Sequence, residues 1–155
     1  MSLSVSSLVL RAKQLELEGI RHLAGRIELV DVIGQLIHAL QRERGATSIF
    51  LASSGQRFAS ERQATVESVT PIEARLRELF EAQLAPEAGA SARMLSLMAW
   101  VVLDLDALAG LRAQTVGHTV TAHVAVTAYS RLIAGLVELI FHVADATLHP
   151  GISRL

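Results

Sequence analysis

The sequence predicts an all-α protein: an antiparallel helical bundle, similar to a four-helix bundle, with about five helices. Of the 155 residues, 51% are hydrophobic, mostly Leu, Ala and Val, and only 4% are aromatic. This composition favours helices over sheets. Apolar residues also recur at spacings of three and four, and Gly and Pro residues divide the chain into segments of helical length.

The first helix is expected over 6–23 and the second over 27–53, because Gly25 weakens the apolar pattern between them. The second helix is expected to end at Ser53-Ser54-Gly55. Glycine suits the left-handed conformation that commonly follows a helix terminus.

The third helix is expected over 57–84, and Pro71 inside it must kink the helix or restart it. For a restart, Thr70 would be the cap, Pro71 the first-turn proline and Glu73 the capping-box acid. Residues 84–91 are expected to form a loop.

The fourth helix is expected over 92–116 and the fifth over 119–148, where His149-Pro150-Gly151 stops it. The second and fifth helices are natural packing partners in an antiparallel bundle. Residues 152–155 resemble the opening turn of another helix. We therefore expect a single domain over 1–155 that is a fragment of a longer protein, truncated at Leu155.

Charge and composition exclude several classes of protein. The net charge of −1 gives no broad basic face, so we expect no direct contact with nucleic acid. The absence of cysteine excludes disulfides, zinc–thiolate sites, iron–sulfur clusters and thiol catalysis. No charge-free apolar run reaches the roughly 18–20 residues of a membrane span. With no signal peptide in the sequence, we expect a cytoplasmic location.

The sequence carries no pattern typical of an enzyme or a cofactor site. A P-loop, a dinucleotide-binding glycine pattern and a nucleophile elbow are missing. His142 and Asp145 have the helical spacing of a metal-ligand pair, but surface or capping histidines are the simpler interpretation, so we expect no metal. An enzyme is the least supported function, because no nucleophile–base pair is visible.

One apolar stripe of the second helix contains an arginine. Its members are Ile33, Ile37, Leu40, Arg44, Ser48 and Leu51. This spacing predicts that Arg44 points toward the core, with Thr47 and Ser48 one turn further on. Arg42 falls on a polar face instead. An unpaired buried guanidinium costs several kcal/mol or more, so Arg44 needs an anionic partner.

A second inward arginine is expected on the fourth helix, where Arg112 continues the stripe Val101, Leu105, Leu108. Tyr129 on the fifth helix shares a face with Ile133 and Leu136, so that its phenol can lie near an arginine. Two other groups have simpler interpretations. Met94, Met98 and Trp100 are expected in the core, and Arg62, Glu67, Arg75 and Glu78 on a solvated face.

Two interpretations of the inward arginines stay open. In the first, they form an anion pocket, because a guanidinium presents paired N–H donors that suit planar oxyanions. Thr47, Ser48 and Tyr129 would add directional donors. In the second, the aliphatic part of the Arg44 side chain is buried and its guanidinium reaches water, or the guanidinium pairs with Glu43, Asp104 or Asp106.

Three segments resemble the nitrate- and nitrite-sensing domain family. Residues 38–47 read HALQRERGAT and are followed by Phe50-Leu51-Ala52-Ser53, Gly55 and Phe58. Residues 108–112 read LAGLR, and residues 128–133 read AYSRLI. The resemblance covers roughly 30–141 and implies an all-helical fold. It also implies that the ligand is nitrate or nitrite and that arginines of the first motif bind it. Arg44 is the first residue assigned to this role and Arg42 the second, while the weaker assignment of Arg112 rests on its motif match and inward position.

The resemblance is greatest to cytoplasmic members in which the sensing domain precedes an RNA-binding antitermination domain. It therefore implies a signal-sensing module that relays a helix rearrangement to an effector domain outside this chain. The spacing of residues does not distinguish nitrate from nitrite. The alternative is a structural or dimerisation bundle with internally paired arginines and no small ligand. In either case, we expect a homo-oligomer, because the first helix is amphipathic.

Overall fold

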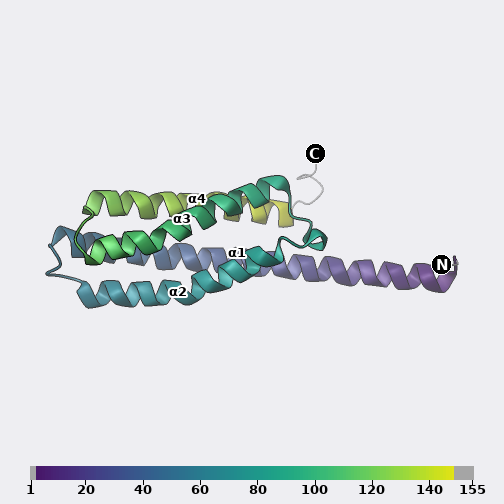
Figure 1. Ribbon diagram of the computed structural model, residues 1–155. Helices are drawn as coiled ribbons and strands as arrows, with labels where there is room; N and C mark the ends of the chain where they lie inside the picture. The colour runs from purple at the N-terminus through teal and green to yellow at the C-terminus, as the bar shows by residue number, and fades with distance from the viewer. Residues whose placement is uncertain (1–2, 149–155) are drawn as a thin grey trace.

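The computed structural model describes residues 3–148, which form four α-helices in an antiparallel bundle (Figure 1). The helices are α1 (Val5–Ala52), α2 (Ala59–Ala82), α3 (Ala92–Val116) and α4 (Ala122–Leu148), and a short 3-10 helix, η1 (Pro86–Ala88), follows α2. The connections 53–58 and 117–121 lie at the same end of the bundle, which we call the loop end (Figure 1). The predicted all-α class is confirmed.

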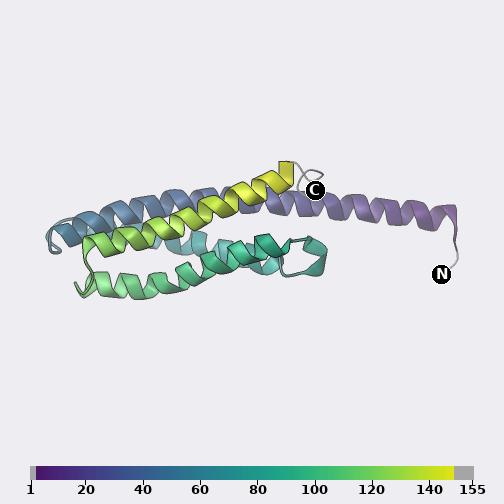
Figure 2. The same cartoon turned by 90° about the horizontal axis from the view of Figure 1, so that it is seen from above.

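The predicted break at Gly25 is wrong, because α1 is one continuous helix of 48 residues. A single glycine costs a helix only about 1 kcal/mol relative to alanine, which the flanking residues can offset. The first half of α1 extends beyond the other helices (Figures 1 and 2). Its exposed side chains include Leu8, Leu15, Leu17 and Ile20, and Leu29 is the first buried residue of α1.

The predicted end of α1 is confirmed. Gly55 has a φ of +81°, and its N–H donates to the carbonyl of Phe50 at 2.8 Å. This six-to-one hydrogen bond satisfies a carbonyl that the helix end leaves free. A Cβ atom at Gly55 would lie 2.7 Å from Cε1 of His118. Glycine therefore also lets the two connections of the loop end approach each other.

Of the kink and the restart predicted as alternatives at Pro71, the structure has the kink. Helix α2 runs without interruption from Ala59 to Ala82 and bends near its middle (Figure 1). The Thr70 hydroxyl donates to the carbonyl of Val66 at 3.0 Å and caps nothing, while Glu73 accepts from Arg77. Pro71 is exposed, so water can satisfy the carbonyl that loses its donor.

The bounds of α3 agree with the sequence prediction, and the Ser91 hydroxyl caps its first turn by accepting from the Met94 N–H at 3.1 Å. Helix α4 begins three residues later than predicted. Thr121 precedes it, and the Thr121 hydroxyl accepts from the Val124 N–H at 3.2 Å. The predicted stop at 149–151 and the turn over 152–155 lie outside the described residues.

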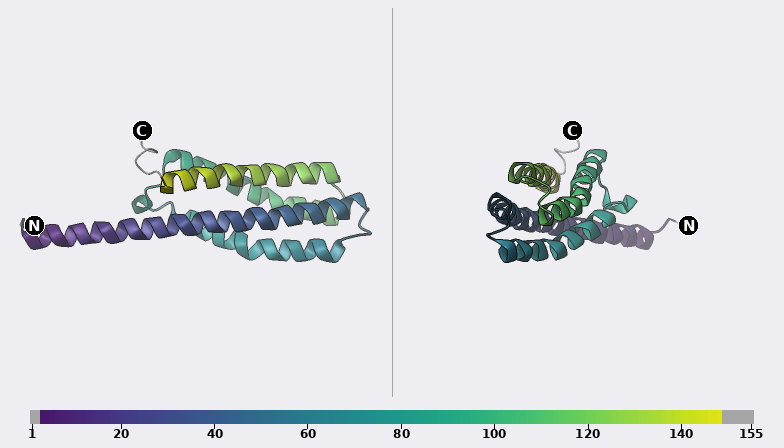
Figure 3. Two further views of the ribbon diagram at one scale, coloured as in Figure 1. Left: turned by 180° about the vertical axis from the view of Figure 1, so that it is seen from behind. Right: turned by 60° about the vertical axis from the view of Figure 1, so that its left-hand side comes forward.

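Helix α1 packs against α2 and α4, and α3 packs against α4 (Figure 3). The predicted partnership of the second and fifth sequence helices is therefore confirmed. Met94 and Met98 are buried as expected, but Trp100 is 64% exposed. Trp100 precedes Val101 of the buried stripe by one residue, which turns its side chain about 100° away from the core.

Helices α3 and α4 are long and apolar enough to cross a membrane, judged by length and composition alone. Composition does not separate such a span from the core helix of a soluble bundle. In this structure, both helices contribute side chains to the common core, among them Val101, Leu105, Leu132 and Leu136.

Candidate functional site

Buried polar side chains of the described chain gather in the half of the bundle nearest the loop end. They are Glu43 and Thr47 of α1, Arg62 of α2 and Thr115 of α3. A buried polar group is costly unless it is hydrogen-bonded, so each of these side chains needs a partner.

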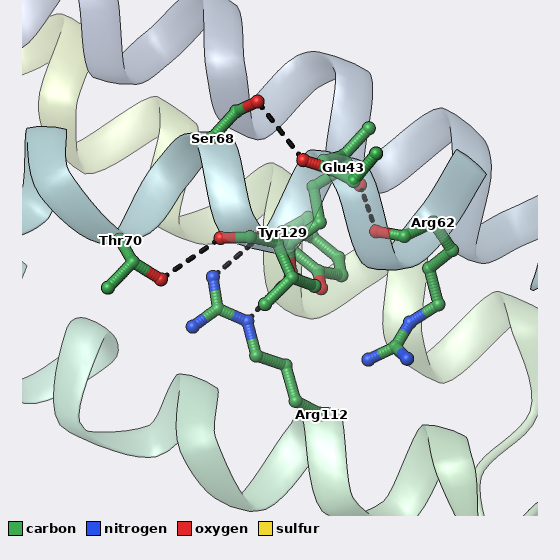
Figure 4. A network of polar contacts seen from close by, with 9 residues as sticks. Glu43, Arg62, Ser68, Thr70, Arg112 and Tyr129 are labelled. Atoms are coloured by element: carbon green, nitrogen blue, oxygen red, sulfur yellow. Dashed lines mark hydrogen bonds and ion pairs between the residues drawn. The ribbon is translucent and has the colours of Figure 1, made fainter. Parts of the chain in front are cut away.

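Glu43 lies at the centre of a cluster that joins three helices (Figure 4). Its carboxylate accepts from Nε of Arg112 at 3.0 Å and from Nη2 of Arg112 at 2.7 Å. The phenol of Tyr129 donates to the same carboxylate. Glu43 is fully buried, and the Arg112 side chain is only 18% exposed. We call Glu43, Arg112 and Tyr129 the Glu43 cluster.

Two members of the Glu43 cluster, Arg112 and Tyr129, have shifted pKa values. Burial lowers the pKa of Arg112, but hydrogen bonds from Arg112 to Glu43 and the charge of that carboxylate outweigh burial, so the net pKa of Arg112 is raised. Burial raises the pKa of the Tyr129 phenol well above its usual value, and the Glu43 charge raises it further. Tyr129 therefore remains a neutral donor while Glu43 and Arg112 form an ion pair.

The raised pKa of Tyr129 predicts a loss of stability at alkaline pH. An unfolded phenol ionises near pH 10, whereas the folded phenol keeps its proton above that pH. The folded state then binds more protons, so the free energy of unfolding falls by up to about 1.4 kcal/mol per pH unit above roughly pH 10. Tyr129 is the only tyrosine, and ultraviolet absorbance of tyrosinate measures its ionisation directly.

Denaturant titrations at several pH values should show this fall in the wild-type protein and a shallower one in Tyr129→Phe. Tyrosinate absorbance should rise together with unfolding. A phenol that ionises near pH 10 while the helices stay folded would contradict its burial in the cluster.

The buried stripe of α1 runs through Glu43 and not through Arg44. Its members at the loop end are Ile33, Leu36, Leu40, Glu43, Thr47 and Phe50, with spacings of three and four in alternation. This repeat of about 3.5 residues is typical of helices that pack along their length in bundles. The predicted stripe repeats every 3.6 residues, so along the helix it falls progressively out of step with the buried positions. It therefore contains Arg44, whereas the buried stripe contains Glu43.

The remaining sequence-predicted residues lie around this stripe. Arg44 is half-buried, and its Nη1 donates to Oγ of Ser130 on α4 at 3.2 Å. Ser48 is half-buried and Arg42 is exposed. The Thr47 hydroxyl is fully buried beside the Tyr129 phenol.

The carboxylates proposed as internal partners of Arg44 contact other arginines. Glu43 pairs with Arg112, Asp106 lies 2.9 Å from Nη2 of Arg77, and Asp104 lies 3.9 Å from Nε of Arg131. No ion pair among the described residues includes Arg44. Arg44 is thus a half-buried cation whose observed partner is a neutral hydroxyl.

Arg62 is buried, so the prediction that it lies on a solvated face is wrong. The residue is 4% exposed, and its guanidinium carbon lies 5.8 Å from the ring centroid of Phe50. Figure 4 shows Arg62 leaving α2 on the side that faces the Glu43 cluster. Arg62, Val69 and Leu76 are spaced by seven and lie on the buried face of α2. That heptad spacing is the sequence pattern that could have identified Arg62 as inward-facing.

Comparison with known proteins identifies the family. A family model described as nitrate and nitrite sensing matches residues 35–155. The chain belongs to the nitrate- and nitrite-sensing family. The predicted resemblance is therefore confirmed, and the matched region contains Arg44, the Glu43 cluster and Arg62. The family is defined by a sensing role rather than by catalysis.

Two relatives of this nitrate- and nitrite-sensing chain are longer proteins. It is 29% identical over 143 residues to the nitrate regulatory protein of Klebsiella oxytoca, covering 92% of this chain and 35% of that protein. The solved structure of the NasR transcription antiterminator matches with a TM-score of 0.79 and 30% identity. That match covers 96% of this chain and 40% of the antiterminator chain.

Proposed function

We propose that this chain is a nitrate- or nitrite-binding sensor module of a cytoplasmic regulator. The observation that supports the proposal most directly is Arg44, a half-buried cation without a carboxylate partner among the described residues. It lies within the region that the family model matches. A bound anion would compensate a charge that is costly to leave unpaired.

The proposed anion lies between α1 and α4, with Arg44 as its main ionic partner. Arg44 already reaches Ser130 across this boundary, and Ser48 follows Arg44 by one helical turn on α1. Arg42 is exposed and can contribute long-range attraction. Arg112 uses Nε and Nη2 for Glu43, so we assign a positioning role to Arg112 together with Tyr129 and Thr47.

The same boundary suits a relay of the signal. Glu43 precedes Arg44 directly and binds α3 through Arg112 and α4 through Tyr129. An anion that draws α1 toward α4 therefore acts on a helix whose contacts extend through the bundle. Such an anion favours the closer arrangement by its differential affinity, with a coupling of about 1–3 kcal/mol. We propose an RNA-binding effector region outside this chain as the recipient.

Nitrate should raise the thermal unfolding midpoint in a concentration-dependent manner. Stabilisation follows the ratio of ligand concentration to Kd and reaches about 2.7 kcal/mol at a hundredfold excess over Kd. Arg44→Ala should remove most of this response while leaving the helix content intact. Arg44→Lys should respond weakly, because an ammonium group cannot engage two coplanar oxygens. Thermal unfolding by circular dichroism and calorimetric titration measure these effects.

Sodium chloride at equal ionic strength is the reference titration. Arg131→Ala is the matched control. Arg131 carries the same charge as Arg44 and directly follows Ser130 in the sequence, but its side chain is 78% exposed. Arg131→Ala should keep the wild-type response. A wild-type protein that responds equally to nitrate, nitrite and chloride would contradict the proposal.

One observation favours a second function, a dimerisation bundle. The first half of α1 extends past the other helices and exposes Leu8, Leu15, Leu17 and Ile20. A second copy of the chain could cover these side chains. This function is compatible with anion sensing, and the stability of Leu17→Ala at several protein concentrations tests it.

A further inference from the structure

Arg62 is a charged residue at a core position without an anionic partner. It lies in the first turn of α2 and is only 4% exposed. Its buried Nε makes no hydrogen bond with the described residues, and none of their ion pairs includes it. A guanidinium cannot lose its proton, so Arg62 carries its charge into the core.

Nearby groups do not neutralise Arg62. Helix α2 begins after Phe58, whose side chain makes no capping hydrogen bond, so the free N–H groups of the first turn add partial positive charge. Glu61 is exposed and has no ion pair with Arg62 among the described residues. The buried carboxylate of Glu43 already accepts from two other side chains.

The Arg62 guanidinium has an aromatic contact. Its central carbon lies 5.8 Å from the Phe50 ring centroid, and the Phe50 ring stacks with His118 at 5.3 Å. A cation–π contact returns only part of the cost of removing a guanidinium from water. The in-plane N–H donors of Arg62 remain available, and they suit a small planar oxyanion with two oxygens on one edge.

We propose that Arg62 forms a second binding position for a small monovalent oxyanion of the nitrate class, at the loop end of the bundle. This proposal rests on the proposed function only for the identity of the anion. The two positions are distinct, because Arg44 reaches toward Ser130 on α4 whereas Arg62 lies on α2 against Phe50. One bound anion at each position would balance one arginine charge.

Nuclear magnetic resonance of the isotopically labelled chain tests this proposal without altering Arg62. The Arg62 Nε–H signal, assigned by its loss in Arg62→Met, should shift saturably with sodium nitrate. It should shift less with sodium chloride at equal ionic strength. The same shift should persist in Arg44→Ala.

Each alternative result has a definite meaning. An Arg62 signal that stays still while the Arg44 signal moves overturns the second position and leaves the proposed function intact. An Arg62 signal that moves equally with chloride overturns the oxyanion assignment. Loss of the Arg62 shift in Arg44→Ala overturns the independence of the two positions.

Arg62→Met provides a second measurement, because methionine removes the charge and keeps an apolar side chain of useful length. Its unfolding midpoint without nitrate should equal or exceed that of the wild type, whereas its nitrate-dependent rise should be smaller. Arg57→Met is the matched control, because Arg57 is exposed at the same end of the bundle, and it should keep the full response. An undiminished nitrate response in Arg62→Met, or a marked loss of nitrate-free stability, overturns the proposal.

Discussion

Replacing Glu43 with alanine is expected to lower the free energy of unfolding by about 3–5 kcal/mol. The substitution leaves the Arg112 guanidinium, whose side chain is 18% exposed, without its bidentate partner. It also leaves the buried Tyr129 phenol without its acceptor. Small domains are stable by about 5–15 kcal/mol, so this variant should lose a large fraction of its stability. Urea denaturation followed by far-ultraviolet circular dichroism measures the loss.

Two comparisons isolate the cause. Glu78→Ala removes an exposed carboxylate that contacts Arg75 at 2.9 Å, and it should cost less than about 1 kcal/mol. The double variant Glu43→Leu with Arg112→Met removes both charges and should recover much of the stability lost in Glu43→Ala. A cost below 1 kcal/mol for Glu43→Ala would mean that water reaches the cluster.

Replacing Leu40 with alanine is expected to cost about 2–5 kcal/mol, because Leu40 is fully buried between α1 and its neighbours. The cost includes the lost burial of the side chain and the cavity that remains. Leu17→Ala changes the same residue type on the same helix at a position that is 53% exposed. It should stay within about 0.5 kcal/mol of the wild type.

This pair of leucines also tests the dimerisation bundle. If Leu17→Ala costs as much as Leu40→Ala and the loss depends on protein concentration, a second copy covers the first half of α1. A loss in Leu17→Ala that does not depend on concentration would instead contradict the exposure of this half. Unfolding curves at several protein concentrations provide the measurement.

Much of the fold could be predicted because helices are determined by local patterns. Gly55 ends α1 as expected, since a left-handed residue after a helix is a local requirement. Gly25 does not break α1 as predicted, because its local penalty is smaller than the stability that the surrounding helix provides. Tertiary packing decides such cases, and a propensity scale does not contain it.

The site was harder to predict, because it depends on the rotation of each helix. A difference of one residue turns a side chain by about 100°. That difference separates the fully buried Glu43 from the half-buried Arg44. The prediction that Arg62 lies on the surface rests on where charged residues usually lie, whereas its heptad spacing with Val69 and Leu76 indicates the core. Which carboxylate meets which arginine could be found only from the packed structure.

The length of α1 gives it the mechanical properties of a lever. The 24 residues from Val5 to Glu28 precede Leu29, the first buried residue of α1, and span about 36 Å at 1.5 Å per residue. A tilt of α1 by about 5° about Glu28 moves Val5, at the far tip, by roughly 3 Å, in proportion to that rise. If α1 tilts about Glu28, the displacement of its tip at Val5 is therefore about 1.5 times that of Arg44, which lies about 24 Å to the other side of this pivot.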